Sequence, residues 1–426
     1  MNGREAQLPK GWQIKKLVDL SSHLGDGLHG TPKYSIDGDY YFINGNNLKD
    51  GVIEFKESTK RVSIDEFKKY KKNLTDRTIL VSINGTLGNV AFYNEEKIIL
   101  GKSACYFNLL ESVDKNFIKY ILSSSYFLDY AHKEATGATI KNVSLKTMRE
   151  FEIPLPPLPE QQRIVSILDE AFAVIERCRN NAEQNLRNAK ELFESYLQGV
   201  FEKKGDGWEE KTLGEAFQMR PQKSEVKNKL KDNDYVTFLP MEDLGIGQIE
   251  VSGVKRKELK DVYSGYTYFA ENDVLLAKIT PCFENGKLGI ARNLINGVGF
   301  GSSEYFVFRT KGIVLSEYLY YFLSQNLIKE GGKKSMGGAV GHQRVSKEWI
   351  EAFFIPFPTS VTEQQNIIQQ LNTLQAETKK LEAIYQQKIN DLEELKKSIL
   401  QKAFSGELSR REFMELTSGS GVEKIK

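Results

Sequence analysis

The sequence is poor in the residues that build disulfide scaffolds and thiolate metal sites. Its 426 residues include three cysteines, Cys105, Cys178 and Cys282, which lie far apart and form no Cys-x-x-Cys pair. Disulfide frameworks and structural zinc sites need even numbers of cysteines or close ligand spacing. We therefore expect neither a disulfide scaffold nor a cysteine-bound metal.

The sequence also lacks long hydrophobic runs. No apolar stretch approaches the roughly 18 residues that a membrane-spanning helix needs. The first residues, MNGREAQLPKGW, contain no hydrophobic core of a secretory signal. These features predict a protein that works in the cytoplasm without a membrane partner.

Neither sign of charge dominates. Lys and Arg total 59 and Asp and Glu total 57, a formal net charge of +2. A nucleic-acid binder that relied on its own net charge would be far more basic. Any affinity for DNA must therefore come from local patches, from specific contacts or from a partner.

The chain contains a long internal repeat. Gly11-Trp12 recurs as Gly207-Trp208, an offset of 207 − 11 = 196, and Glu160-Gln161-Gln162 recurs as Glu363-Gln364-Gln365, an offset of 363 − 160 = 203. Further matches fall between them in the same order, so the second copy carries small insertions. A repeat of this length predicts one structural unit built twice.

The first part of each copy has the pattern of a mixed α/β globule. Short β-branched runs such as 78–83 and 274–279 are bounded by turn dipeptides such as Asn84-Gly85 and Asn285-Gly286. The second part predicts a long helix that begins after IPLPPLPEQQ (153–162) or IPFPTSVTEQQ (355–365). In the second copy, Thr362 with Gln365 fits a capping box at the helix start.

An apolar seam recurs along both predicted helices at alternating steps of four and three residues. It runs from Ile164 through Leu192 and Tyr196 in the first copy and from Ile367 in the second. A seam sustained over five heptads indicates a coiled-coil partner, and two matching helices in one chain pair most simply with each other, antiparallel. About 40 residues at ~1.5 Å each would give a rod of about 60 Å.

These patterns predict an α+β fold with two pseudo-repeated mixed α/β domains separated by two long helices that form an antiparallel coiled coil. The expected parts are a first globule (1–155), a first spacer helix (156–204), a second globule (205–357), a second spacer helix (358–410) and a flexible tail (411–426).

Several segments resemble the specificity subunit of Type I restriction-modification enzymes. They include GDGLHGTPKYSIDGDYYFINGNNLKDG (25–51), TILVSINGTLGNVAFY (78–93) and ATGATIKNVSLKTMREFEIPLPPLPEQQRIVSILD (135–169). The second copy adds VLLAKITPCFENGKLGIAR (274–292), IPFPTSVTEQQNIIQQL (355–371) and ILQKAFSGEL (399–408). The resemblance covers nearly the whole chain, departing at FPTSVTEQQ, where LPPLPEQQ is replaced.

The resemblance implies that each globule is a target recognition domain that reads one half of a bipartite, asymmetric sequence in double-stranded DNA. It implies that the paired helices set the unread spacer and dock two modification subunits, which use S-adenosylmethionine to methylate adenine. Whether translocase-endonuclease (restriction) subunits also join is left open. The chain itself would need no cofactor.

Catalytic motifs are missing from the sequence. It has no Asn-Pro-Pro or Asp-Pro-Pro, which an adenine methyltransferase needs, and Gly101-Lys102-Ser103 lacks the earlier glycine of a phosphate loop because Glu96 stands there. The four histidines (His23, His29, His132 and His342) show no metal-ligand spacing. We therefore expect a non-catalytic subunit without a metal site.

Candidate DNA contacts lie in loops rich in forked donors and acceptors, since Arg and Lys pair with guanine edges and Asn and Gln with adenine edges. In the first globule the candidates are His29, Thr31, Lys33, Tyr34, Asn44, Asn46, Asn47, Lys102, Thr139, Lys141 and Asn142. In the second they are Lys278, Lys287, Ser302, Ser303, Lys333, Lys334, His342, Gln343 and Arg344.

The repeat alone also fits another class of protein. Each candidate residue could be a solvated loop residue or a turn former. Two protein-binding globules on a coiled-coil rod, a scaffold without any role on DNA, would show the same duplication. The resemblance favours the DNA-specificity subunit.

Overall fold

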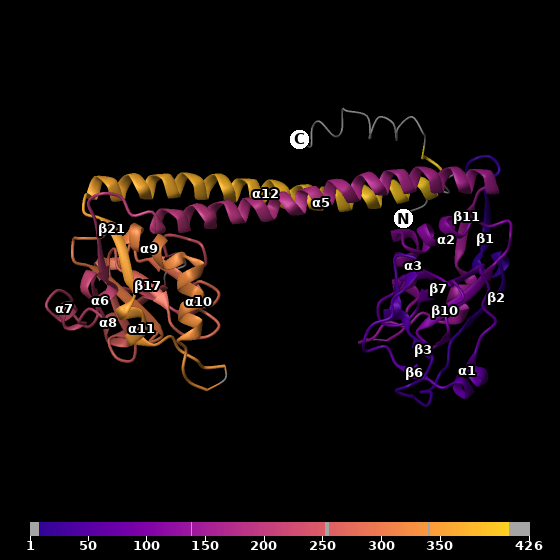
Figure 1. The fold of residues 1–426 in the computed structure, drawn as a ribbon, viewed down its shortest axis with the longest axis horizontal. Helices are drawn as coiled ribbons and strands as arrows, with labels where there is room; N and C mark the ends of the chain where they lie inside the picture. Colours follow the sequence, from indigo (N-terminus) through magenta and orange to yellow (C-terminus); the bar gives the residue numbers. More distant parts are fainter. Residues whose placement is uncertain (1–7, 138, 252–254, 340, 409–426) are drawn as a thin grey trace. The chain divides into compact units, whose positions relative to one another are not determined.

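The computed structural model describes residues 8–137, 139–251, 255–339 and 341–408 (Figure 1). The chain divides into two compact units. Unit 1 comprises residues 1–183 and 386–426, and unit 2 comprises residues 184–385. The tail predicted at 411–426 lies outside the described residues.

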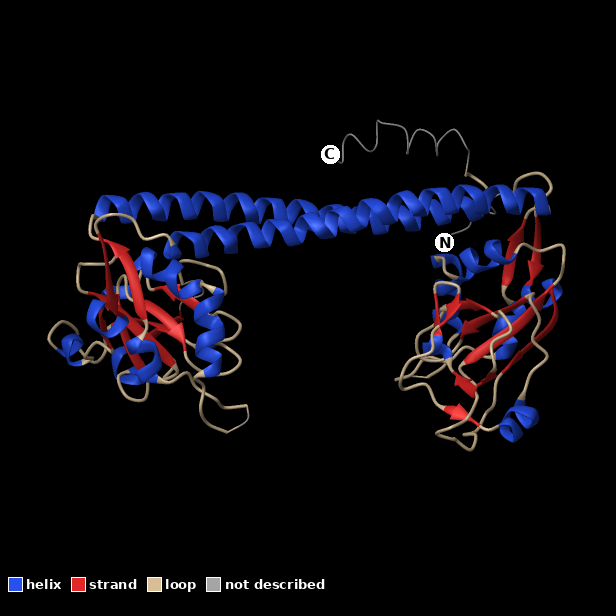
Figure 2. Cartoon of the chain, viewed as in Figure 1, coloured by secondary structure: helices blue, strands red, loops and turns tan. Residues whose placement is uncertain are grey.

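Unit 1 is built on a four-stranded antiparallel sheet and a smaller three-stranded sheet (Figure 2). The four-stranded sheet has the order β2 (Ser21–Asp26), β10 (Ala104–Leu109), β7 (Thr78–Ser82), β8 (Val90–Phe92). The smaller sheet has the order β6 (Arg61–Val62), β3 (Tyr40–Ile43), β9 (Ile98–Leu100). Two further pairs are β1 (Gln13–Lys16) with β11 (Glu152–Leu155) and β4 (Leu48–Lys49) with β5 (Val52–Ile53). The short helices are α1 (Ile64–Tyr70), α2 (Lys115–Leu122), α3 (Ser125–Glu134) and α4 (Leu145–Glu150).

Unit 2 repeats this plan. Its main sheet has the order β13 (Phe217–Met219), β20 (Tyr305–Thr310), β17 (Val274–Ala277), β18 (Leu288–Ile290). Its second sheet has the order β15 (Lys255–Glu258), β14 (Tyr235–Leu239), β19 (Val298–Gly301), β16 (Thr267–Ala270). The pair β12 (Trp208–Thr212) with β21 (Phe354–Pro358) matches β1 with β11. The short helices are α6 (Leu213–Ala216), α7 (Ser224–Lys227), α8 (Leu259–Val262), α9 (Ser316–Ser324), α10 (Asn326–Lys334) and α11 (Lys347–Ala352).

The two units share a topology. In both, the second sheet contains one parallel pair, β3 with β9 in unit 1 and β14 with β19 in unit 2, among antiparallel neighbours. The duplicated α+β fold that the sequence predicts is thus confirmed.

The central strands are buried on both faces. In unit 1, Ile79 and Val81 of β7 lie in the core beneath the helices, whereas Leu80 lies in the core between the two sheets. Side chains alternate between the faces of a strand, so a strand that is covered on both sides must be apolar throughout. This is why the centre of β7 (79–81, ILV) and the whole of β17 (VLLA) are apolar.

The two long helices are α5 (Leu158–Glu202) and α12 (Val361–Ser405). Within unit 1, the first half of α5 packs on the second half of α12, and Arg179 lies 3.2 Å from Glu393. Within unit 2, the second half of α5 packs on the first half of α12, and the Tyr196 hydroxyl donates to Gln370 Oε1 at 3.0 Å. The helices are therefore antiparallel in each unit, as predicted.

Part of the predicted seam is wrong. Leu192 and Tyr196 are 51% and 39% exposed, and Phe193, Leu197 and Phe201 turn into the core instead. The buried face of α5 shifts by one residue because the helix packs on the unit 2 globule as well as on α12. Similarly, Ser360 rather than Thr362 caps α12, since its Oγ accepts a hydrogen bond from the Glu363 amide at 3.4 Å.

A buried glutamine ties each long helix to its globule. The Gln161 side chain, 1% exposed, accepts from the Asp114 amide at 2.8 Å and donates to the Pro156 carbonyl at 2.8 Å. Gln364, 0% exposed, accepts from the Leu315 amide at 2.9 Å and donates to the Pro358 carbonyl at 2.9 Å. The repeated Glu-Gln-Gln motif therefore fixes where the globule meets the helix.

Candidate DNA interface

Three loops of unit 2 meet at one end of its main sheet. The unit 2 loop cluster comprises residues 278–287, 302–304, 337–339 and 341–344, and Arg344 forms β-bridges with both Ile279 and Gly337. The Val345 amide donates to the Lys278 carbonyl at 2.8 Å, and the Thr280 amide donates to the Gln343 carbonyl at 3.0 Å. Backbone pairing thus brings together predicted residues that lie up to 66 positions apart, from Lys278 to Arg344.

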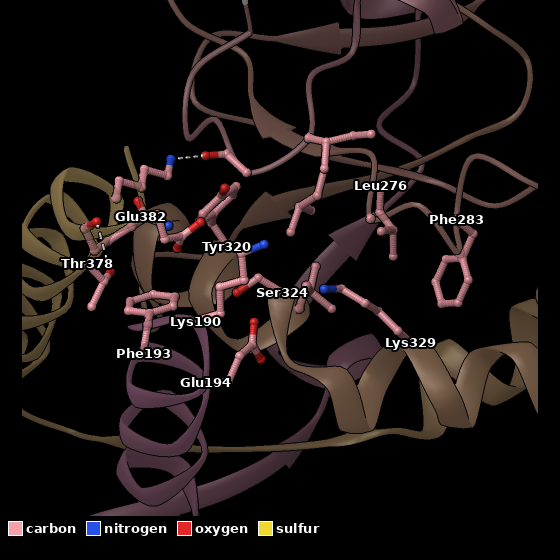
Figure 3. A pocket seen from close by; sticks show the side chains of 17 residues that line it. Lys190, Phe193, Glu194, Leu276, Phe283, Tyr320, Ser324, Lys329, Thr378 and Glu382 are labelled. Atoms are coloured by element: carbon pink, nitrogen blue, oxygen red, sulfur yellow. Dashed lines mark hydrogen bonds between the residues drawn. The ribbon is translucent and has the colours of Figure 1, made fainter. Parts of the chain in front are cut away.

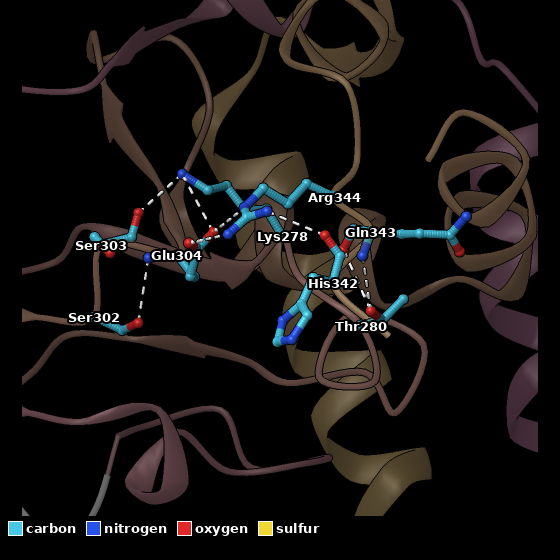
Figure 4. A network of polar contacts seen from close by, with 8 residues as sticks. All are labelled: Lys278, Thr280, Ser302, Ser303, Glu304, His342, Gln343 and Arg344. Atoms are coloured by element: carbon cyan, nitrogen blue, oxygen red, sulfur yellow. Dashed lines mark hydrogen bonds and ion pairs between the residues drawn. The ribbon is translucent and has the colours of Figure 1, made fainter. Parts of the chain in front are cut away.

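Charged side chains converge in this cluster (Figure 4). Arg344 Nε and Nη2 donate to the two carboxylate oxygens of Glu304, each at 2.9 Å. Lys278 Nζ donates to the Ser303 carbonyl at 2.9 Å and lies 3.8 Å from Glu304. The contact with Arg344 lowers the pKa of Glu304, so this carboxylate is held ionised. Burial lowers the pKa of Lys278, because the cation loses hydration, and Arg220 and Arg344 add repulsion against the attraction of Glu304.

This arrangement suits readout of base edges. A guanidinium that makes two parallel hydrogen bonds can pair with guanine O6 and N7, and a carboxylate can accept from cytosine N4. The Arg344 side chain is 46% exposed, so its fork is accessible from solvent. Because that fork is held by Glu304, contact with guanine would exchange one acceptor for another.

The other predicted residues of unit 2 contribute mainly through the backbone. Ser302 Oγ accepts from the Glu304 amide at 3.2 Å, and the Gln343 amide donates to Thr280 Oγ1 at 3.1 Å. The His342 carbonyl accepts from Arg344 Nη1 at 3.1 Å, and its residue is exposed. These contacts shape the cluster and leave the His342 ring at its surface.

Unit 1 builds the same frame with neutral side chains at the bridging positions. The unit 1 loop cluster comprises residues 83–89, 101–103, 136–137 and 139–142. Asn142 forms β-bridges with Asn84 and Thr136, as Arg344 does with its two partners in unit 2. Asn84 Nδ2 donates to Asn142 Oδ1 at 3.0 Å. Amides can pair with adenine where the unit 2 cluster presents an ion pair. Lys102, Thr139 and Lys141 are exposed around this pair.

Two more predicted segments adjoin the unit 1 cluster. Ser103 Oγ donates to Asn44 Oδ1 at 3.0 Å, and Asn46 beside it is exposed. The Lys102 amide donates to the Leu28 carbonyl at 3.0 Å, which places the 29–34 loop next to Lys102.

Within that loop the candidate side chains remain largely accessible. The residues Thr31 and Lys33 are exposed, and the Lys33 amide donates to Glu66 Oε2 at 3.0 Å. Tyr34 is 48% exposed, with its ring 6.1 Å from that of Phe42. The exposed His29 has its Nε2 2.6 Å from Asp26 Oδ2, a contact that can orient the ring.

Two candidates are structural residues and are withdrawn as base readers. Asn47 is 5% exposed, and its amide accepts from the Asn44 amide and donates to the Glu54 carbonyl. Lys287 Nζ donates to the Met241 carbonyl at 2.6 Å and the Glu242 carbonyl at 3.2 Å. Both side chains satisfy backbone groups of nearby turns, which sequence alone cannot distinguish from accessible donors.

Lys333 and Lys334 were expected on a loop, but they lie in the last turn of α10. Both are exposed, and neither hydrogen-bonds nor ion-pairs with the unit 2 loop cluster within the described residues. Basic residues at this position stabilise the carboxyl end of a helix. Their role therefore needs no contact with DNA.

Sequence reasoning missed two residues, Ser103 and Glu304, whose side chains hold candidate residues in place. Ser103 and Glu304 occupy matching places, because the Ile83 amide donates to the Ser103 carbonyl at 3.0 Å and the Lys278 amide donates to the Glu304 carbonyl at 2.9 Å. Aligning the two copies residue by residue would have found this pair of positions. Glu304 was overlooked because an acidic side chain is an unusual candidate for DNA contact.

The described residues were also searched for metal and membrane features. They contain no group of three or more His, Cys, Asp or Glu side chains that could hold a metal ion. None of the helices in this part of the chain is both long and apolar enough to cross a bilayer.

Comparison with known proteins finds one family over both copies. A family model described as Type I restriction modification DNA specificity domain matches residues 9–184 and 205–394. The EcoAI specificity subunit of the Type I restriction enzyme from Escherichia coli is 39% identical over 165 residues, which span 38% of this chain and 27% of that relative.

Longer alignments are more divergent. The StySPI specificity subunit from Salmonella potsdam is 23% identical over 463 residues, 99% of this chain and 96% of that protein. A solved chain from work on complex assembly and conformational transition of the type I R-M system matches with a TM-score of 0.71 at 17% identity. That match covers 94% of this chain and 100% of the solved one, and shows a shared fold.

Proposed function

The chain belongs to the family of Type I restriction modification DNA specificity domains, and we propose that it is the DNA-specificity subunit of a Type I restriction-modification complex. In this role the loop cluster of unit 1 reads one half of a bipartite target in double-stranded DNA, and that of unit 2 reads the other.

One observation supports an asymmetric DNA target. The two clusters share a backbone frame, with Asn142 and Arg344 at matching bridges, yet present different chemistry. Unit 1 offers paired amides and unit 2 an ion pair. Because amides and guanidinium groups prefer different base edges, equal frames with unequal side chains would read unequal half-sites.

The long helices supply the second part of the proposal, docking of two modification subunits. In unit 2, Leu192, Leu381 and Ile384 are 51%, 38% and 40% exposed. Exposed apolar side chains along a helix offer surface that a partner protein can bury. Nearby, a cavity of about 300 Å³ lies among Phe193 of α5, Tyr320 of α9 and Thr378 of α12 (Figure 3).

Catalysis is assigned to the partners. The modification subunits would bind S-adenosylmethionine and methylate adenine in the cytoplasm, and restriction subunits could join the same assembly. This chain is a non-catalytic subunit in the proposal. Its near-neutral charge of +2 supports that division, because most of the electrostatic affinity for DNA would then come from the partners.

The test is methylation sequencing of a host that carries the chain with its modification subunits. We expect one bipartite adenine-methylated motif, and replacement of residues 20–150 by the segment of a family member should change only one half of it. A chain that binds modification subunits without giving any methylated motif would contradict the proposal and favour a scaffold.

A second experiment tests whether the helices set the spacer. Matched insertion of seven residues into α5 and α12 keeps the apolar faces in phase over two helical turns. We expect a longer spacer between unchanged half-sites. Altered half-sites with an unaltered spacer would remove the helices from this role.

A further inference from the structure

A groove of about 780 Å³ opens in unit 2 beside its loop cluster. Lys278 and Ser303 belong to both the cluster and the groove, and the rest of the lining comes from segments outside the candidate set. Those segments are 220–224, at the start of α7, and Tyr263 with 266–268, at the start of β16, and Tyr305 of β20 completes the lining. The groove is therefore continuous with the proposed reading surface.

The charge of the groove has one sign. Its lining includes Arg220, Lys223 and Lys278 and no Asp or Glu. By contrast, the cavity in Figure 3 combines Lys190 and Lys329 with Glu194 and Glu382 among its lining residues. Glu304 lies 3.8 Å from Lys278 outside the lining, so the uncompensated charge is that of Arg220 and Lys223, and it favours an anion.

Arg220 is the cation best placed to bind a ligand. It is exposed, and its guanidinium has no ion pair or side-chain hydrogen bond within the described residues. Its backbone has a φ of 56°, in the left-handed region that non-glycine residues rarely occupy. Such strain persists only where the surrounding structure enforces it, and it is concentrated at functional sites.

The neighbouring wall is fixed in place. Lys223 Nζ donates to the Tyr263 carbonyl at 3.0 Å and lies 5.0 Å from the centre of that ring. Glu225 on α7 accepts from Arg309 Nη1 at 2.7 Å, which ties this segment to the main sheet. Positioned cations lose less conformational entropy on binding than flexible ones.

We propose that this groove, through Arg220, Lys223 and Lys278, binds the phosphate backbone of double-stranded DNA and positions the duplex against the unit 2 loop cluster. This inference rests on the proposed function. The tyrosine rings at the wall are held by the protein, Tyr266 by Phe238 at 4.9 Å and Tyr263 by Lys223, so a phosphate fits the groove better than a stacked base.

At the positions of unit 1 that match Arg220 and Lys278, the residues are uncharged. Gly25 occupies the place of Arg220, because Gly25 pairs with Tyr106 of β10 and the Arg220 amide donates to the Val307 carbonyl of β20. Ile83 occupies the place of Lys278. The two half-sites should therefore contribute unequally to the salt dependence of binding. Unit 2 would anchor the duplex through the phosphate backbone of the DNA, while unit 1 carries a cation at one of the three matching positions, the exposed Lys102 at the place of Ser303.

The experiment uses the full chain assembled with its modification subunits and a duplex carrying the motif found by methylation sequencing. Arg220→Gly removes the cation and suits the left-handed backbone, so loss of fold should not follow. Lys211→Ala on β12, outside the groove, is the matched control. Affinity is measured from 50 to 200 mM salt on the target and on duplexes with one base pair changed.

Each lost phosphate contact should lower the slope of log affinity against log salt by about 0.9. We expect Arg220→Gly to weaken binding roughly tenfold on every duplex alike, Arg220→Lys to restore most of it, and Lys211→Ala to change little. An unchanged salt slope in Arg220→Gly would overturn the proposal that the groove binds phosphate. A loss of affinity that depends on the identity of one base pair would also overturn it, because that result would indicate base reading. A wild-type complex that does not discriminate among these duplexes would overturn the proposed function as well.

Discussion

At matching positions in their main sheets, the two units bury different polar pairs. In unit 1, Thr78 Oγ1 donates to Asn108 Oδ1 at 2.6 Å, and both residues are at most 4% exposed. In unit 2, Asp273 and Arg309 make two hydrogen bonds at 2.9 and 2.8 Å, and the Asp273 side chain is 1% exposed. One topology thus accepts a neutral pair or an ion pair at the same place.

The difference shows what burial demands of a polar pair. A buried neutral pair needs only its hydrogen bonds, whereas a buried carboxylate needs a counter-charge as well. Burial raises the pKa of Asp273, although the hydrogen bonds from Arg309 oppose this, so ionising this buried carboxyl group costs free energy. Unit 2 gains an arginine that also reaches Glu225 and so fixes the wall of its cationic groove.

The largest effect should come from breaking the ion pair. Arg309→Leu leaves a buried, unpaired carboxylate and should destabilise unit 2 by about 3–5 kcal/mol. Asn108→Leu in unit 1 removes a neutral partner and should cost about 1–3 kcal/mol. Hydrogen exchange of the β17 and β7 amides measures each unit separately.

A matched exchange sharpens this comparison. The double variant Asp273→Thr with Arg309→Asn gives unit 2 the pair of unit 1 and should recover most of the loss of Arg309→Leu, because neither residue is then charged. Equal costs for Arg309→Leu and Asn108→Leu would show that the ion pair is no more demanding than the neutral pair.

The buried glutamines should behave alike in both units. Gln161→Ala and Gln364→Ala each leave a backbone amide, that of Asp114 or Leu315, without its acceptor. We expect a cost of about 1–3 kcal/mol in each unit, seen as faster exchange of that amide. A large difference between the two variants would mean that the anchors are not equivalent.

Substitution of the bridging residues Asn142 and Arg344 should have the smallest effect on stability but a selective effect on DNA readout. Arg344→Ala should relax one base position in one half-site by roughly tenfold, and Asn142→Ala one position in the other half-site. Methylation sequencing with single-base target variants resolves both. Relaxation of the same half-site by both variants would contradict the assignment of one half to each unit.

The repeat and the helices could be predicted from local patterns. The Glu-Gln-Gln motif, the β-branched runs and the heptad seam each depend on neighbours in sequence, so they predicted the duplicated α+β units and the antiparallel helices. The exposed faces of Leu192 and Tyr196 could not be found this way, because α5 also packs on the unit 2 globule.

The candidate interface was predicted only in part. Lys278 and Arg344 were identified as donors, but Glu304, which engages both, was missed, and Asn47 and Lys287 proved to be occupied by turns. Residue type indicates what a side chain can bind. Its partner within the protein depends on which distant loops the fold brings together.

The amino-acid order by itself determined two copies of one fold and the long helix in each, because periodicity and turn residues act over a few positions. Tertiary structure alone decided which donors remain open to solvent and which three cations line one groove. Arg220 and Lys278 are 58 residues apart in sequence, 278 − 220, and only the pairing of β13 and β17 with β20 places them along one groove.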